Sequence, residues 1–167
     1  MGGEVKMLTD KQLKKLLKQA IKKFYDNDII LLKDIEGMER SCVFRIGIYL
    51  QELMNNHSEF DNLNLDCEYN KSNTEVKCLN EQHVIPDLII HKRNLDNLTT
   101  NNNIMIVEFK GWWNREHKQD IEKLEAFTNS HDVYNYQLGV FISLSNSYEE
   151  LKPRYFKNGK EINENEL

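Results

Sequence analysis

The sequence predicts an α/β domain in which helices flank a mixed central sheet. Two stretches with helical spacing of apolar residues come first, short strand-like runs between asparagine-rich stretches follow, and one more helix and strand complete the order. The chain has 167 residues, 40% hydrophobic and 29% charged, as is typical of a globular domain with a real core. Because neither a repeat nor a linker divides the sequence, residues 1–167 are expected to form one domain.

The first helix is expected from about Thr9 to Tyr25. Thr9 and Gln12 match a capping box, and apolar residues follow at helical spacing. The opposite face carries a stripe of lysines, namely Lys11, Lys14, Lys15, Lys18 and Lys22. This stripe is either a solvated helix face or a contact for a phosphate backbone.

A second helix is expected from about Glu36 to Met54, with Val43 and Ile46 on its inner side. Glu39 precedes Val43 by four residues, so it extends the inward stripe by one turn and places an acid where an apolar residue is expected. Two readings remain open. Glu39 either directs its carboxylate inward, or it is a first-turn glutamate favoured by the helix dipole.

Short strands are expected after the second helix. Leu63 to Tyr69 alternates apolar and polar residues, Asn70 to Asn73 has the composition of a turn, and Thr74 to Leu79 is the predicted hairpin partner. Pro86 then opens a strand that continues over Asp87 to Lys92, because the first position of a strand can lack an amide donor.

The rest of the sheet is expected from the second half of the chain. The polar loop Asn94 to Asn103 lets the strand Ile104 to Lys110 return antiparallel beside the Pro86 strand. A helix over Lys118 to Thr128 and a strand over Tyr136 to Leu144 follow. Lys157-Asn158-Gly159-Lys160 predicts a type I′ hairpin, and the acidic end Glu164 to Leu167 is expected to fray.

Composition narrows the function classes. The net charge of −5 disfavours a domain that coats nucleic acid through bulk electrostatics, although a local basic groove is compatible with it. No apolar run approaches the length of a membrane span, and the N-terminus lacks a signal-peptide pattern, so a cytoplasmic location is expected. The three cysteines form no CxxC pair, which argues against a disulfide framework or a cysteine zinc site.

Two apolar strands carry charged residues that their hydrophobicity does not explain. Residues two apart in a strand share a face, so Glu108 and Lys110 project to one side while Val107 and Phe109 pack on the other. If the two strands are neighbours, Asp87 at the head of one lies near Glu108 at the tail of the other. Two carboxylates with waters suit Mg²⁺ or Mn²⁺. The sequence contains no HxxxH pattern, which argues against a zinc site.

These residues suit metal-dependent phosphodiester hydrolysis. A divalent ion held by Asp87 and Glu108 stabilises charge on a scissile phosphate and lowers the pKa of a bound water, and Lys110 orients that water and opposes the negative charge. Glu39 supplies an additional carboxylate. The Glu-x-Lys triplet alone is uninformative, because it also occurs elsewhere in the chain, for example at Glu4, Glu75 and Glu150. Only the copy at Glu108 closes an apolar strand and follows a Pro-Asp that opens another.

Pro86-Asp87 followed by Glu108-Phe109-Lys110 resembles the signature of the PD-(D/E)xK nuclease superfamily, the fold of restriction endonucleases and many repair nucleases. The resemblance is closest to small, single-domain, uncharacterised bacterial members. It implies a restriction endonuclease-like αβββαβ core over about residues 36–144, preceded by an extra helix and followed by a hairpin. It also implies that Asp87 and Glu108 are metal ligands, that Lys110 is the catalytic lysine, and that Glu39 is the helix-borne acid.

Other residues near the motif have two readings each. Basic residues that would contact phosphates are Lys92, Arg93, Arg115, Lys118 and Lys123. The resemblance suggests that Asp120 or Lys123 is the polar residue on the following helix. Trp112 and Trp113 either stack on a base, or one of them packs against the last helix. His91 either approaches a phosphate or is a hydrogen-bonded polar residue, and Glu68 either lies near the site or pairs with a surface lysine.

Three hypotheses follow. The first is a Mg²⁺-dependent deoxyribonuclease, with Mn²⁺ as a substitute, which hydrolyses phosphodiester bonds in DNA. Because cleavage of both strands of a duplex usually needs two active sites, a homodimer is a candidate assembly. The second is a catalytically silent domain of the same fold that binds nucleic acid or a partner protein. The third is a structural network of Asp87, Glu108 and Lys110 in an unrelated α/β protein.

Overall fold

A computed structural model describes residues 8–33, 36–69, 71–72, 75–79, 81–93 and 102–167. Its α-helices are α1 (Asp10–Asn27), α2 (Glu39–Met54) and α3 (Lys118–Thr128). Its strands are β1 (Asn64–Cys67), β2 (Lys71–Ser72), β3 (Glu75–Val76), β4 (Cys78–Leu79), β5 (Gln82–His83), β6 (Leu88–His91), β7 (Asn103–Lys110), β8 (Leu138–Ser143), β9 (Arg154–Lys157) and β10 (Lys160–Ile162). Short 3₁₀ helices cover Ile29–Leu31, Ser58–Phe60, Tyr148–Glu150 and Glu164–Glu166.

A mixed sheet forms the middle layer, with strand order β1-β6-β7-β8-β9-β10. Strands β7 and β8 are parallel, and the other neighbouring strands of this sheet are antiparallel. The prediction that the Pro86 strand and the Ile104 strand are antiparallel neighbours is confirmed. Most of the loop expected between them, residues 94–101, lies outside the described residues.

The hairpin expected between Leu63–Tyr69 and Thr74–Leu79 is wrong. Strand β1 pairs with β6 instead, while β2 pairs with β3 and β4 with β5 in two small separate ribbons. Strand β6 is buried along its whole length. By pairing with β6, strand β1 adds to the main sheet and its hydrophobic core. A hairpin with the segment that follows β1 in the sequence would not give β1 this contact with the core.

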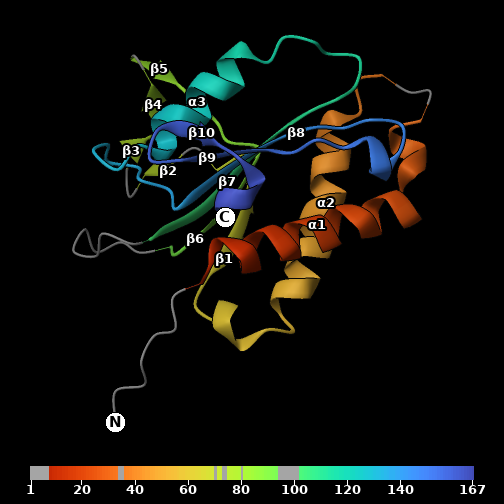
Figure 1. The fold of residues 1–167 in the computed structure, drawn as a ribbon, viewed down its shortest axis with the longest axis horizontal. Helices are drawn as coiled ribbons and strands as arrows, with labels where there is room; N and C mark the ends of the chain where they lie inside the picture. The colour runs from red at the N-terminus through yellow and green to blue at the C-terminus, as the bar shows by residue number, and fades with distance from the viewer. Residues whose placement is uncertain (1–7, 34–35, 70, 73–74, 80, 94–101) are drawn as a thin grey trace.

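The strands present alternate residues to two hydrophobic clusters, one on each face of the sheet. Helices α1 and α2 cover the face that carries Val107 and Phe109, and α3 covers the face that carries Ile89 and Ile106. Figure 1 shows α3 on the opposite side of the sheet from α1 and α2. A mixed α/β fold with a central sheet flanked by helices is thus confirmed.

The local predictions for the helices hold closely. Thr9 caps α1 in a capping box with Gln12, and α3 spans the predicted residues. Helix α2 begins at Glu39 rather than Glu36. Three lysines of the α1 stripe form ion pairs: Lys14 and Lys18 with Glu164, and Lys22 with Asp26.

The C-terminal hairpin also forms as predicted, with positive φ at Asn158 and Gly159, as a type I′ turn requires. The end that follows it forms a 3₁₀ helix capped by Asn163, so the expected fraying is wrong. The ion pairs of Glu164 with Lys14 and Lys18 explain the order of this end. Among the described helices, none is both long and apolar enough to cross a membrane.

Candidate active site

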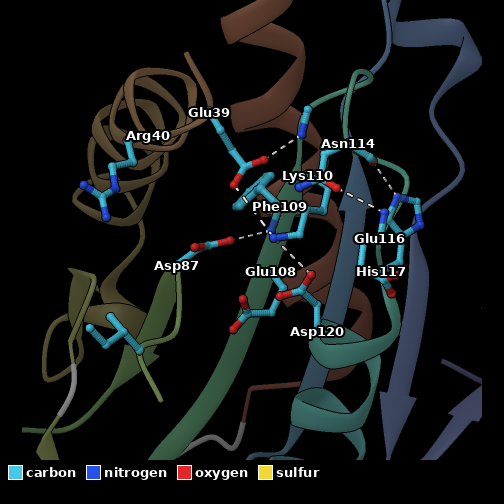
Figure 2. A network of polar contacts seen from close by, with 12 residues as sticks. Glu39, Arg40, Asp87, Glu108, Phe109, Lys110, Asn114, Glu116, His117 and Asp120 are labelled. Carbon is cyan, nitrogen blue, oxygen red and sulfur yellow. Dashed lines mark hydrogen bonds and ion pairs between the residues drawn. The ribbon is translucent and has the colours of Figure 1, made fainter. Parts of the chain in front are cut away.

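The register of β6 and β7 brings the two acids of the motif together. Leu88 lies opposite Val107, so Asp87, one residue earlier, comes next to Glu108, one residue later. Val107 and Phe109 belong to the cluster under α1 and α2, which leaves Glu108 and Lys110 on the α3 side, as predicted. Figure 2 shows Asp87, Glu108, Lys110 and Asp120 around the end of β7, with Glu39 reaching in from α2.

Asp87 is held by the backbone of the neighbouring strand. The amide of Phe109 donates to its Oδ2 at 2.7 Å. Burial raises the pKa of Asp87 to about 6, and the nearby charge of Glu39 adds to this shift, whereas the Phe109 amide and the charges of Lys123 and Lys110 oppose it. Asp87 is therefore a carboxylate whose charge the protein compensates only in part.

Glu108 is the most deeply buried acid of the site, with 1% of its surface exposed. Its Oε2 lies 2.8 Å from the Nζ of Lys123 on α3. Its Oε1 is buried and has no hydrogen-bond partner among the described residues. Burial, and then the charge of Asp87, raise the pKa of Glu108 well above its usual value, despite the adjacent Lys123.

Lys110 is held between acids from two helices. Its Nζ lies 3.1 Å from Oδ2 of Asp120 on α3 and 4.0 Å from Oε1 of Glu39 on α2. Burial alone would lower the pKa of Lys110. The hydrogen bond to Asp120 and the charges of Asp120, Glu39 and Asp87 outweigh burial and raise that pKa. Lys110 is accordingly an ammonium ion in this site, suited to oppose negative charge.

Glu39 reaches the site from the first residue of α2. The amide of Gly111, directly after Lys110, donates to its Oε2 at 2.8 Å. Glu39 therefore directs its carboxylate inward, because it accepts a hydrogen bond from the backbone that follows β7 (Figure 2). Glu39 thereby ties the start of α2 to the end of the strand that carries Glu108 and Lys110.

A pocket of about 220 Å³ opens beside Asp87 and Glu39. Its lining includes Arg40 and Phe44 on the outer side of α2, and Glu68 after β1. Arg40 and Glu68 form an ion pair at 2.9 Å, and Phe44 is 60% exposed. Glu68 therefore does lie near the site, and its described ion-pair partner is an arginine.

The basic residues predicted near the motif are not gathered at one place. Lys92 and Arg93 follow the far end of β6, about 17 Å from Asp87 along an extended strand. Arg93 is bound to Asp66 there through a forked contact. Arg115 is exposed in the loop after β7, whereas Lys123 lies inside the site against Glu108.

The two tryptophans and His91 contact other parts of the fold, although not in every case where the sequence predicted. The indole N–H of Trp112 donates to the carbonyl of Leu32 at 3.0 Å. Trp113 packs against the cluster under α1 and α2, not against α3 as its structural reading assumed. His91 is buried, with Nε2 2.7 Å from Oδ2 of Asp66, so it is a hydrogen-bonded polar residue far from Asp87.

Sequence reasoning missed how Lys123 and the backbone complete the site. Asp120 and Lys123 are three residues apart on α3, and Nζ of Lys123 lies 3.7 Å from Oδ1 of Asp120. Both side chains contact residues of β7, Asp120 through Lys110 and Lys123 through Glu108. The i, i+3 spacing is a signal that could have paired them with Glu108 and Lys110. The amide donors of Phe109 and Gly111 leave no trace in the sequence, because every residue but proline carries one.

The donor set fits a hard divalent cation. An acceptor oxygen that is buried without a donor, such as Oε1 of Glu108, is unfavourable, and a cation would satisfy it. Asp87 and Glu108 offer oxygen ligands, which Mg²⁺ and Mn²⁺ prefer. Within the described ranges, no group of three or more Asp, Glu, His and Cys side chains is arranged to hold a metal ion. The site thus offers two carboxylates.

Comparison with known proteins adds no relative. No family model matches the chain, and neither a curated protein nor a solved structure is significantly similar to it.

Proposed function

We propose that this chain is a nuclease of the PD-(D/E)xK type, which hydrolyses phosphodiester bonds in DNA with Mg²⁺ or Mn²⁺. The observation that carries the proposal is the juxtaposition of Asp87, Glu108 and Lys110 at the end of β7, with one oxygen of Glu108 left without a donor among the described residues. DNA as the substrate is what the resemblance to restriction and repair nucleases implies.

Each residue has a role in this proposal. Asp87 and Glu108 would hold the divalent cation through their carboxylate oxygens, the ligand type that Mg²⁺ prefers. The bound cation supplies charge stabilisation at the phosphate and a more acidic water. Lys110 faces the same region as an ammonium ion and opposes the negative charge that develops there. Asp120 and Glu39 fix the position of Lys110.

The order of elements supports the family assignment. Helix α2, strands β1, β6 and β7, helix α3 and strand β8 follow one another as helix, three strands, helix and strand, apart from the small ribbons β2 to β5. This is the αβββαβ order that the resemblance implies. It brings Glu39, the Asp87–Glu108 pair and Lys110 to one end of the sheet.

A cleavage assay tests the proposal. Labelled linear, nicked, branched and single-stranded DNA is incubated with Mn²⁺ and the purified chain. Lys110→Ala and Glu108→Gln are expected to slow cleavage by about 100-fold or more, because each removes charge needed in the transition state. Lys160→Ala is the control, since Lys160 is an exposed lysine on β10, at the edge of the sheet and away from β7. Unchanged cleavage by Lys110→Ala would contradict the proposal.

A catalytically silent domain that binds nucleic acid or a partner protein is the second candidate. The observation that favours it is that both lysines of the site already pair with acids, Lys110 with Asp120 and Lys123 with Glu108. Calorimetric titration with Mn²⁺ separates the two functions. A silent domain shows no Mn²⁺ binding that depends on Asp87, whereas the nuclease loses its Mn²⁺ binding on Asp87→Asn.

A further inference from the structure

Lys123 lies inside the site, in contact with one of its two motif acids. Its Nζ lies 2.8 Å from Oε2 of Glu108, 3.3 Å from the carbonyl oxygen of Ile85 and 3.7 Å from Oδ1 of Asp120. Its side chain is only 14% exposed. The Lys123 ammonium group thus contacts the segment before β6, the end of β7 and the first turn of α3.

Glu108 depends on this lysine for charge compensation. Among the described ion pairs, Lys123 is the partner of Glu108, and it contacts only one of the two carboxylate oxygens. The other oxygen has no donor among the described residues. A buried carboxylate without a counter-charge is strongly unfavourable, so Lys123 stabilises the charged form of Glu108.

We propose that Lys123 is a resident counter-ion, which competes with a divalent cation for Glu108 and thereby sets how tightly the chain binds that cation. The inference rests on the proposed function, in which Asp87 and Glu108 hold the cation. It assigns to Lys123 a role in cation affinity rather than in contact with DNA.

The geometry allows this competition without unfolding the site. A cation held by Asp87 and Glu108 would stand close to the Lys123 ammonium, and like charges at such separations repel strongly where water is largely excluded. The lysine stem is flexible, and the carbonyl of Ile85 and the carboxylate of Asp120 are already within reach. Lys123 can therefore give up Oε2 of Glu108 and keep the Ile85 carbonyl as an acceptor and Asp120 as an ion-pair partner.

Two substitutions move the cation affinity in opposite directions. Lys123→Met keeps much of the stem and removes the charge, so Mn²⁺ is expected to bind about tenfold more tightly. Lys123→Arg keeps the charge, and its planar fork can contact both oxygens of Glu108, so Mn²⁺ is expected to bind more weakly. The measurement is calorimetric titration of the full-length chain with Mn²⁺.

Thermal unfolding provides a readout that needs no catalysis. Without metal, Lys123→Met is expected to melt several degrees below the wild type, because Glu108 loses its counter-ion. Added Mn²⁺ is expected to raise the melting temperature of Lys123→Met more than that of the wild type. Lys118→Met, which removes an exposed lysine of the same helix, is the matched control and should leave both quantities unchanged.

The outcomes distinguish this inference from the proposed function. If Asp87→Asn abolishes Mn²⁺ binding but Lys123→Met binds Mn²⁺ no more tightly than the wild type, the inference is overturned and the metal site stands. If Lys123→Met is too unstable to titrate, Lys123→Arg decides, and binding as tight as the wild type overturns the inference. If the wild type binds no Mn²⁺ through Asp87, the proposed metal site itself is overturned.

Discussion

Asp87 and Glu108 are neighbours with different surroundings. Asp87 receives a hydrogen bond from the Phe109 amide, whereas Glu108 relies on Lys123 and keeps one oxygen without a donor among the described residues. Burial raises the pKa of both carboxyl groups; the charge of Glu39 adds to this shift for Asp87, and the charge of Asp87 adds to it for Glu108. Raised pKa values of neighbouring acids are common at functional sites and also occur in structural ion-pair networks.

Asp87→Asn is expected to stabilise the metal-free protein at neutral pH. The pKa of Asp87 is about 6 in the folded chain and near 3.8 when unfolded, so the folded state binds more protons and loses stability as pH rises between these values. Asn removes this penalty and still offers an oxygen to the Phe109 amide. The gain should reach at most about 3 kcal/mol above pH 6 and vanish below about pH 4.

Urea unfolding in EDTA at pH 4 and pH 8 measures this difference. The buffer conditions are the same for both proteins, so other titrating groups largely cancel in the comparison. A loss of several kcal/mol on Asp87→Asn at pH 8 would instead indicate a structural ion-pair network, in which Asp87 is a needed partner.

At the scale of elements, the position of α3 decides the site, because this helix supplies both Asp120 and Lys123. It packs on β8 at Gly139, where a Cβ would lie 2.9 Å from Cγ2 of Thr128 and 3.2 Å from Cβ of Phe156. The Thr128 hydroxyl donates to the Leu124 carbonyl at 2.8 Å, which fixes its side chain. The absence of a side chain at Gly139 is thus what lets α3 approach the sheet.

Gly139→Ala is expected to destabilise the protein by about 1–3 kcal/mol, since the added methyl group overpacks this contact. Chemical denaturation measures the change. Adding Thr128→Ser removes the methyl group that clashes and keeps the hydroxyl, so the double variant should recover most of the loss. Equal stability of Gly139→Ala and Gly139→Ala/Thr128→Ser would show that the Thr128 methyl group is not the cause.

At the scale of the whole molecule, the chain is acidic and so is the candidate site. The net charge is −5, and Glu39, Asp87, Glu108 and Asp120 lie around two lysines. Lys92 and Arg93 stand at the other end of β6 and so add no positive charge beside these acids. DNA phosphates approaching this end of the sheet therefore meet a repulsive field unless a cation reverses it.

DNA binding is accordingly expected to depend on a divalent cation. At fixed ionic strength, Ca²⁺, which takes the same oxygen ligands, should tighten binding of labelled DNA by about tenfold relative to EDTA, as measured by fluorescence anisotropy. Asp87→Asn should abolish this response. Equal affinity in Ca²⁺ and in EDTA for the wild type would mean that DNA binds elsewhere on the molecule.

Predictions from the sequence succeeded where the determining interactions are local. The capping box at Thr9, the helix Lys118–Thr128 and the Asn158-Gly159 turn depend on residues within a few positions of one another. The hairpin expected from Leu63 to Leu79 failed because the partner of β1 is the distant strand β6. The prediction that Lys92 and Arg93 lie near the motif is also wrong. They are close to Asp87 in sequence, but an extended strand separates them from it.

The sequence by itself determined the fold class and the motif. Periodicity placed Asp87 and Glu108 on apolar strands and gave Glu108 and Lys110 a common face, because the pleat of a strand fixes which side chains share a side. Only the tertiary structure decided which charges meet. The pairing of Glu108 with Lys123, of Lys110 with Asp120 and of Glu39 with the Gly111 amide joins separate elements. Such contacts are set by how helices pack on a sheet, which local spacing does not encode.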